Sequence, residues 1–485
     1  MNTLGTLCIT SESSLDFATL SGDFNPLHLD PVAARRTQFG RTLIHGVCGT
    51  LQALDLWLAG NPEVAALNAL KVRYARPITQ GEDITVLAQS DAEGVRLELV
   101  AGGARCQVIE MCLLRTDPGA RLQPEFRAPS AQPRVCEAPS IDNCQGDADA
   151  VELIWDPAFA RRLFPHACAA LPARQLASLI ATTQIVGMKC PGLHSVYSNL
   201  ELQFADAADL ASNSQLHYRV ETADARFNRV VLSVGNAYVQ GAVEAFFRAK
   251  PANQARMAEV VATVPPDCFT GQRALLVGAS RGLGEVMAKV LAAGGAEVAL
   301  TYARGKSDAE TVADDIASER ARPIVLQHDV LAGEPGAEVA AFCDDMTHLY
   351  YLASPIIDKG ESGRWNGELF RTFCRFYIDG LATLLEHLQR VVGKQRQMHV
   401  FVPSSVFLDG NIKGFDEYIA AKHAAESYAA RFSSANANWS LSAPRLPRLH
   451  TDQTSGVADS GPEETLQVVV AMLREICPAG QAPSR

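Results

Sequence analysis

The chain has 485 residues and a formal net charge of -11; 47% of the residues are hydrophobic and 20% are charged. A single hydrophobic core does not grow to this length, so we expect about two to four domains. The acidic balance and the absence of a Lys/Arg run exclude nucleic acid as an expected partner. No run of about 18 apolar residues occurs, so we expect no membrane span.

The cysteines and the N-terminal segment indicate the compartment. Twelve cysteines occur without a CxxC pair or a Cys/His metal spacing, which favours reduced thiols and no metal centre. Cys48, Cys112 and Cys343 lie in apolar surroundings in the sequence and are expected to pack as small hydrophobic side chains. The segment MNTLGTLCITSESS lacks a basic region and a long apolar core, so we expect no signal peptide. These features together predict a cytoplasmic protein.

Residues 1–115 predict one α+β domain. A long apolar segment, 41–58, is compatible with a helix, and four strand-like runs separated by Gly and Pro turn signals follow it. An apolar helix followed by an antiparallel meander indicates a sheet wrapped around a buried helix. The four runs are residues 69–75, 83–90, 95–100 and 106–114.

Residues 116–150 are rich in Pro, Ala, Gly and Ser and predict a linker that lies along a surface. Residues 151–250 then repeat the earlier plan, with a helix predicted at 171–186 ahead of further strand-like runs. We interpret this part as a diverged duplication of the first domain. Its strand-like runs are residues 195–204, 214–222, 228–234 and 239–248.

A second linker is predicted at residues 251–270, and residues 271–485 have a different pattern. Short apolar strands alternate there with helix-length segments, which predicts βαβ units around a doubly wound parallel sheet. The last residues, 478–485, are expected to fray. The strand-like runs are residues 274–277, 297–301, 323–326, 348–352, 398–402 and 439–443.

The decapeptide Ser21-Gly22-Asp23-Phe24-Asn25-Pro26-Leu27-His28-Leu29-Asp30 gathers reactive side chains around a proline. The residue before Pro is held out of the α region, so we expect Asp23 and His28 on an irregular segment that aims both at one point. A carboxylate and an imidazole so placed suit the activation of water, and a polar loop with caps is the alternative interpretation. Phe39-Gly40 and His45-Gly46 follow at the start of the predicted helix, whose N-terminal N–H groups can bind a developing oxyanion.

This pattern, with Val72-Arg73-Tyr74-Ala75-Arg76-Pro77-Ile78 and Gly81-Glu82-Asp83, resembles the MaoC-like (R)-specific enoyl-CoA hydratases and dehydratases over residues 10–115. The resemblance implies a hotdog fold, in which an antiparallel sheet wraps a helix. It also implies a double hotdog, with residues 151–250 as a degenerate second half that completes an acyl tunnel.

The same resemblance implies roles for individual residues. Asp23 and His28 hold and activate the water, Asn25 orients it, and the Gly46 backbone N–H polarises the thioester carbonyl. We expect His45 to be structural rather than catalytic.

A glycine-rich loop follows the strand at 274–277 and opens a helix at 283–293, the context in which a helix N-terminus binds a dinucleotide pyrophosphate. Its G-x-x-x-G-x-G spacing resembles that of the short-chain dehydrogenases/reductases, and a tight turn alone is the alternative. The predicted cofactor-binding residues of this loop are Gly278, Ser280, Arg281, Gly282, Leu283 and Gly284.

The residues after the next strand bear on the choice of cofactor. No acid is available there for a ribose 2′-OH, whereas Arg304 and Lys306, with Arg281, can face a 2′-phosphate. This favours NADPH over NAD; ordinary surface charge is the alternative interpretation. The resemblance further implies that Asp329 and Val330 contact the adenine.

Tyr418 and Lys422 lie four residues apart on a predicted helix and so share one face. An ammonium beside a phenol lowers the phenol pKa, which suits a proton donor to a carbonyl. Ser405 precedes Tyr418 by thirteen residues, a spacing that resembles the short-chain reductases over residues 271 to about 455. The resemblance implies that Ser405 orients the carbonyl and that Lys422 also contacts the nicotinamide ribose.

This part departs from that family at three places. Leu352-Ala353-Ser354-Pro355 replaces the usual Asn-Asn-Ala-Gly, and Pro444-Arg445 replaces Pro-Gly. Tyr377 stands where the family has a fourth catalytic residue, Asn, which holds a water behind the Lys. Because of this last replacement, an inactive reductase is an alternative interpretation.

These observations predict a bifunctional enzyme. One end reduces a 3-oxoacyl thioester to the (R)-3-hydroxyacyl thioester with NADPH, and the other dehydrates it to the trans-2-enoyl thioester, or hydrates in reverse. The alternative is a hydratase/dehydratase alone, with a dinucleotide-binding or dimerising C-terminal domain; a non-catalytic thioester-binding scaffold is opposed by the intact sets of reactive residues. The carrier, CoA or an acyl carrier protein, is left open, and we expect a homodimer or higher homo-oligomer.

Overall fold

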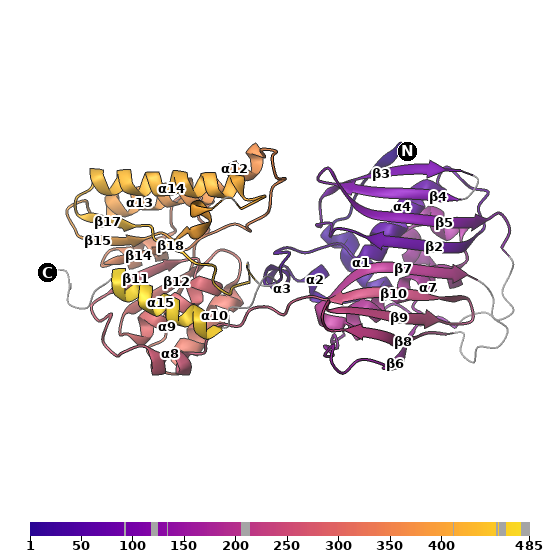
Figure 1. Cartoon of the computed structure of the whole chain (residues 1–485), viewed down its shortest axis with the longest axis horizontal. Coiled ribbons are helices and arrows are strands. Elements are labelled where there is room, and N and C mark those ends of the chain that lie inside the picture. Colours follow the sequence, from indigo (N-terminus) through magenta and orange to yellow (C-terminus); the bar gives the residue numbers. More distant parts are fainter. Residues whose placement is uncertain are drawn as a thin grey trace. The chain divides into compact units, whose positions relative to one another are not determined.

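The computed structural model describes residues 1–91, 94–117, 125–132, 134–204, 214–410, 412–452, 454 and 462–476. The chain forms two compact units, Met1–Lys250 and Pro251–Arg485, which are considered separately (Figure 1). No helix within the described ranges is long and apolar enough to cross a membrane. The expected fraying of residues 478–485 lies outside those ranges.

The first unit is organised around a ten-stranded sheet with strand order β1-β3-β4-β5-β2-β7-β10-β9-β8-β6. Its two halves join where β2 pairs antiparallel with β7, Ala69 opposite Gln203 and Arg73 opposite Asn199. The strands of the first half are β1 (Asn2–Cys8), β2 (Ala66–Tyr74), β3 (Asp83–Ser90), β4 (Val95–Ala101) and β5 (Ala104–Leu114). Those of the second half are β6 (Ala148–Glu152), β7 (Ser195–Phe204), β8 (Gln215–Asp224), β9 (Arg229–Gly235) and β10 (Val239–Phe247).

Each half has one long buried helix ahead of four antiparallel strands, in the order that the sequence predicts. These helices, α4 (Gly46–Leu58) and α7 (Ala173–Gln184), are buried over most of their length and lie on one face of the sheet (Figure 1). They share one hydrophobic core with the strands. The shorter helices are α1 (Ser11–Ser21), α2 (Pro26–Leu29), α3 (Pro31–Arg35), α5 (Pro157–Leu163) and α6 (Pro165–Ala170).

Two local expectations for the first unit are wrong. The helix predicted from residue 41 begins only at Gly46, because Leu43 forms an antiparallel bridge with Thr79, which holds the preceding chain extended. Cys112 is exposed rather than packed in the core, because successive side chains of a strand alternate between faces and Met111 takes the buried one.

The second unit contains a six-stranded parallel sheet of order β13-β12-β11-β14-β15-β17. Counted along the chain this is 3-2-1-4-5-6, the doubly wound order, in which ligands bind at the carboxyl ends of the strands where the order reverses. That point lies between β11 and β14. The strands are β11 (Arg273–Val277), β12 (Glu297–Tyr302), β13 (Ile324–Gln327), β14 (His348–Tyr351), β15 (Met398–Phe401) and β17 (Trp439–Ser442), with a separate pair β16 (Ser404–Ser405) and β18 (Arg445–Leu446).

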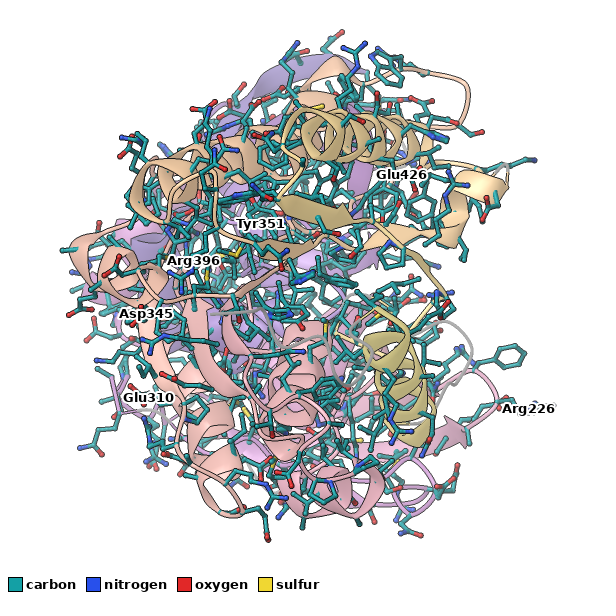
Figure 2. All side chains as sticks on the ribbon, turned by 90° about the vertical axis from the view of Figure 1, so that its left-hand side faces the viewer. Arg226, Glu310, Asp345, Tyr351, Arg396 and Glu426 are labelled. Carbon is teal, nitrogen blue, oxygen red and sulfur yellow. The ribbon has the colours of Figure 1, made fainter. Side chains whose placement is uncertain are left out.

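Helices cover both faces of this sheet and bury a hydrophobic cluster on each side (Figure 1). Tyr351 of β14, labelled in Figure 2, is buried in the sheet, whereas Asp345 is exposed. The helices are α8 (Met257–Thr263), α9 (Gly282–Ala293), α10 (Lys306–Ala317), α11 (Ala337–Cys343), α12 (Gly367–Cys374), α13 (Gly380–Val391), α14 (Asp416–Ala435) and α15 (Pro462–Ile476).

The segment 251–270 is more than the linker that the sequence predicts. It contains α8, whose Met257 and Val260 are buried, and Lys289 of α9 donates a hydrogen bond to the Ala255 carbonyl at 2.9 Å. Met257 and Val260 are three residues apart, so both side chains lie on the same face of this short helix and pack together.

Candidate active sites

Capping interactions hold Asp23 between two helices. α1 ends at Gly22, which has a φ of 74°, and the Asn25 side chain then caps α2 by accepting a hydrogen bond from Leu27 N at 3.0 Å. Pro26 occupies the first position of α2, where proline favours helix initiation. His28 therefore lies on a single helical turn, and not on the irregular segment that the sequence predicts.

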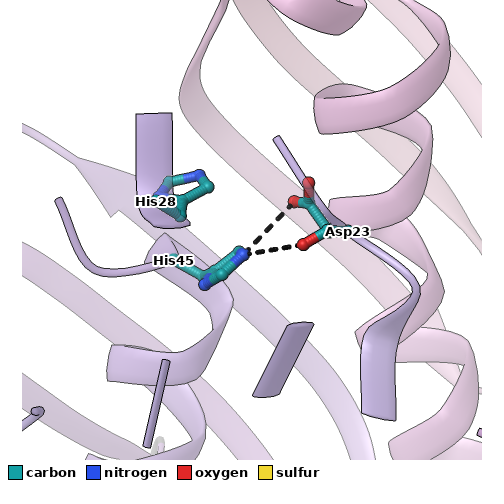
Figure 3. Close-up of side chains that lie close together, drawn as sticks. All are labelled: Asp23, His28 and His45. Atoms are coloured by element: carbon teal, nitrogen blue, oxygen red, sulfur yellow. Dashed lines mark hydrogen bonds and ion pairs between the residues drawn. The ribbon is translucent and has the colours of Figure 1, made fainter. Parts of the chain in front are cut away.

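Three side chains converge beside this turn. The oxygen and nitrogen atoms of Asp23, His28 and His45 that could share a ligand lie within 4.8 Å of one another (Figure 3). His28 Nδ1 lies 3.0 Å from the Leu43 carbonyl; since a carbonyl only accepts, Nδ1 carries the hydrogen and Nε2 is left as the acceptor. His45 Nε2 donates in the same way to the Asp23 carbonyl at 3.1 Å.

Burial sets the protonation of this cluster. It raises the pKa of Asp23, while the charge of His28 and hydrogen bonds from Thr183 and the Asn25 backbone lower it. Burial also lowers the pKa of His28. The Asp23 carboxylate and the hydrogen bond to the Leu43 carbonyl act in the opposite direction and raise it. The pKa of the Asp23 carboxyl group is therefore raised toward neutral pH, which suits a group that exchanges protons with water.

His45 has a different character from His28, although the two rings stack with their centroids 3.9 Å apart. Burial and the neighbouring His28 hold the pKa of His45 well below its ordinary value, so the ring is neutral. It holds the Asp23 backbone and stays outside the cavity lining.

A cavity of about 140 Å³ opens beside Asp23 and His28. Its size is close to that of a cavity of about 150 Å³ that binds benzene in another protein, so it holds a few carbon atoms. Gly46, at the N-terminus of α4, is part of the wall, and a Cβ there would lie 2.8 Å from the Tyr74 ring. Both halves line the cavity: Leu27, Phe39, Leu43, Ile44, Ala75, Arg76, Pro77, Ile78 and Gln107 from the first, and Thr183, Val186, Gly187, Ser195, Val196 and Tyr197 from the second.

Sequence reasoning missed the hydrogen bonds that the second half makes with Asp23 and Asn25. Thr183 donates a hydrogen bond to Asp23 Oδ2 at 2.7 Å, and Asn25 Nδ2 donates to the carbonyls of Gly187 and Gly192 at 3.0 and 3.1 Å. No motif surrounds these residues. The Asn25 side chain therefore joins the two halves instead of facing the cavity.

A second group of predicted residues meets in the second unit. Ser405 lies on β16, and Tyr418 and Lys422 lie one turn apart on α14. Burial raises the pKa of Tyr418, and a hydrogen bond with Ser405 lowers it. Burial thus outweighs the lowering of the Tyr418 pKa that the sequence led us to expect.

Neutral groups contact the Lys422 ammonium directly, and the Glu426 carboxylate acts on it from one turn further along α14. Its Nζ donates to the Pro403 carbonyl at 2.8 Å and lies 3.9 Å from the centroid of the Tyr377 ring. Burial lowers the pKa of Lys422 to about 7. The Tyr377 hydroxyl lies 2.8 Å from the Ser354 hydroxyl. The ring of Tyr377 thus covers one side of the ammonium.

The glycine loop after β11 fits a dinucleotide. Gly278 has a φ of 84°, and a Cβ on Gly284 would lie 2.4 Å from the Gly278 carbonyl oxygen, so this close turn requires glycine. Gly278 N donates to Thr301 Oγ1 at 3.2 Å, which ties the loop to β12. The loop lies at the point where the strand order reverses, beside Ala353 after β14.

The three predicted phosphate-binding cations have different surroundings. Arg281 forms an ion pair with Asp452 at 3.2 Å, whereas Arg304 and Lys306 are exposed near the end of β12. Asp329 accepts a hydrogen bond from Leu331 N at 3.0 Å, and Val330 is buried. Ser280 is buried in the loop, and Leu283 is partly buried against the core.

Arg445, at one of the departures from the short-chain reductase pattern, forms two ion pairs. It pairs with Glu426 of α14 at 2.8 Å and also with Asp409. Ser404 donates to Glu426 at 2.5 Å. This network fastens β16 and β18 to the helix that carries Tyr418.

Two family models match the chain, one in each unit. The MaoC like domain matches residues 3–110, and the short chain dehydrogenase domain matches residues 272–442. The chain therefore carries a MaoC-like domain at its N-terminus and a short-chain dehydrogenase domain toward its C-terminus. This confirms the two resemblances that the motifs indicate.

Individual proteins are similar over shorter stretches. Peroxisomal multifunctional enzyme type 2 of Mus musculus is 34% identical over 90 residues, 18% of this chain and 12% of that protein. The (R)-specific enoyl-CoA hydratase of Aeromonas caviae is 61% identical over 31 residues, 6% of this chain and 23% of that protein. A versicolorin reductase of Emericella nidulans is 38% identical over 82 residues, 17% of this chain and 30% of that protein. The chain thus covers less than a third of each relative.

Among solved structures, a short chain dehydrogenase from Burkholderia cenocepacia in complex with NADP has a TM-score of 0.38 at 20% identity. The match covers 45% of this chain and 95% of that one.

Proposed function

We propose that the chain is a bifunctional enzyme of acyl-thioester metabolism. Its first unit interconverts an (R)-3-hydroxyacyl thioester and the trans-2-enoyl thioester, and its second unit makes the hydroxyacyl thioester by NADPH-dependent reduction of a 3-oxoacyl thioester. The observation that carries the proposal is the buried Asp23 carboxylate beside the partly buried His28 ring, both of which line a small cavity at the N-terminus of α4.

In the hydration direction the oxygen of water adds to C3 and a proton adds to C2. His28 Nε2 and the Asp23 carboxylate are placed to take a proton from the water and to return one to C2. Between these two proton transfers, negative charge develops on the thioester oxygen, where the Gly46 N–H at the helix N-terminus would stabilise it. Dehydration reverses these steps.

For the second unit, the close-packed glycine loop supports a dinucleotide, and NADPH when bound supplies a hydride to a carbonyl carbon. Tyr418 would donate a proton to the carbonyl oxygen, with Ser405 as a second hydrogen-bonding group. Gly278, Gly282 and Gly284 would approach the pyrophosphate, and Arg304 and Lys306 a 2′-phosphate. These assignments follow the family resemblance residue by residue.

A second candidate function keeps the hydratase and makes the second unit a non-catalytic dinucleotide-binding or dimerising module. The observation in its favour is the Tyr377 ring, 3.9 Å from Lys422 Nζ, which occupies the place of the relay Asn. Under this candidate, Tyr418→Phe leaves the turnover of the whole chain unchanged.

The remaining proposals concern architecture and surroundings. We propose a double hotdog of residues 1–115 and 151–250, whose second half has lost the reactive motif, followed by a reductase domain of residues 271–485. Either CoA or an acyl carrier protein could carry the acyl thioester. We propose that the chain forms a homo-oligomer and that neither reaction uses a metal. The cytoplasm is the proposed compartment; the relative from Mus musculus is named as peroxisomal, so imaging of a tagged chain decides between the two.

Product analysis tests the whole proposal. The full chain is given NADPH and acetoacetyl-CoA, or the matching carrier-protein thioester, and the products are separated. Formation of (R)-3-hydroxybutyryl and crotonyl thioesters supports both activities. Crotonyl hydration without NADPH oxidation at saturating cofactor selects the second candidate, and the absence of hydration by wild type, or its persistence in Asp23→Asn, refutes the hydratase assignment.

A further inference from the structure

The second half of the first unit contributes a hydroxyl group to the site that contains Asp23. Thr183, near the end of α7, donates to Asp23 Oδ2 at 2.7 Å, and the two side chains are only 3% and 1% exposed. The residues are 160 positions apart, and the sequence around Thr183 has no likeness to the motif around Asp23. The contact exists because the two halves pack together.

The chain after Thr183 follows the same carboxylate. α7 continues as a π turn, Ile185–Lys189, and Gly187 lies one turn beyond Thr183 on the same side. A Cβ on Gly187 would lie 2.2 Å from Asp23 Oδ1, so the helix backbone touches the carboxylate directly. One helix of the second half thus holds the Asp23 carboxylate by a hydrogen bond and by close contact.

Titratable groups face Asp23 from several elements. His28 of α2 and His45 ahead of α4 face it from the first half, and the Cys136 thiol interacts with it from the segment before β6. Arg248, after β10, acts on His28 and on Cys136. Thr183 differs from all of these groups, because it is a neutral donor in direct contact with the carboxylate.

We propose that Thr183 is a positioning residue for the hydratase chemistry, whose hydroxyl orients the Asp23 carboxylate and favours its ionised form. The inference rests on the hydratase function proposed above. The Thr183 hydroxyl donates to Oδ2 and the Asn25 backbone N–H donates to Oδ1, so both oxygens are held in place and each keeps a further lone pair for water. The half that lacks the reactive motif therefore takes part in catalysis through Asp23.

The test compares Thr183→Val with Thr183→Ser in the full chain, by crotonyl-CoA hydration over a range of pH. A hydrogen bond to a charged group is strong, so we expect Thr183→Val to lower kcat at neutral pH by about tenfold or more, with little change in KM. Because that bond lowers the pKa of Asp23, its loss moves the acid limb of the kcat/KM profile to higher pH. Thr183→Ser, which keeps the hydroxyl, should restore both.

Thr182→Val is the matched control. Thr182 is equally buried, but its hydroxyl donates to Leu179 O of its own helix at 2.7 Å, so the acid limb should stay in place. A Thr183→Val profile that coincides with wild type, or a Thr183→Ser variant as impaired as Thr183→Val, overturns the inference. If wild type hydrates no enoyl thioester, the proposed function fails; carbon NMR titration of the Asp23 carboxyl then still decides whether Thr183→Val raises its pKa, as the inference requires.

Discussion

Alanine at position 187 would displace the carboxylate on which the proposed hydratase depends. A Cβ there lies 2.2 Å from Oδ1 and 2.5 Å from Oδ2 of Asp23, whereas ordinary contacts begin at 3.4 Å. The helix and the carboxylate must therefore move apart by about 1.2 Å. A misplacement of about 1 Å can cost about 100-fold in rate, and overpacking of this kind costs about 1–3 kcal/mol of stability.

The assay is crotonyl-CoA hydration by the full chain, with Gly235→Ala as the matched control. A Cβ on Gly235 meets its nearest neighbour, the Val239 carbonyl oxygen, at an ordinary 3.5 Å, so this variant should keep the wild-type kcat. We expect Gly187→Ala to lose about 100-fold in kcat while its circular dichroism and cooperative melting persist. A folded Gly187→Ala variant with wild-type kcat would refute Asp23 as the reacting carboxylate.

Three predictions concern the second unit. Burial lowers the pKa of Lys422 from 10.5 to about 7. Between pH 7 and 10.5 the unfolded chain therefore binds a proton that the folded chain lacks. Thermal stability should accordingly rise with pH across this window. Melting curves of Lys422→Met should lose that rise; an unchanged slope would mean that another group causes it. Asp452→Asn removes the carboxylate that pairs with Arg281, so the KM for NADPH should fall about tenfold while that for NADH stays constant; equal changes for both cofactors would exclude Arg281 as a 2′-phosphate ligand. Tyr377→Asn reopens the space behind Lys422 and should raise the rate of 3-oxoacyl thioester reduction about tenfold or more; an unchanged rate would show that no relay passes this position.

The strands of both units were predictable because their apolar runs and turn signals are local. The run at 195–204 coincides with β7, and those of the second unit agree with β11 to β17 within a residue or two. β1 and α1 escaped prediction for local reasons as well. β1 has no buried residue, and α1 begins with polar residues that are recognisable as a helix start only through the Thr10 cap.

The reactive groups that the sequence alone reveals are those that lie close together along the chain. Asp23, His28 and Gly46 lie within some two dozen positions, and Tyr418 and Lys422 share one helical turn, so spacing along the chain suffices to place them. Only the tertiary structure decided which distant groups touch them. Thr183 meets Asp23, and the Tyr377 ring meets Lys422, because packed helices bring them into contact; a contact between residues far apart in the chain depends on how the elements pack, and no local pattern records it.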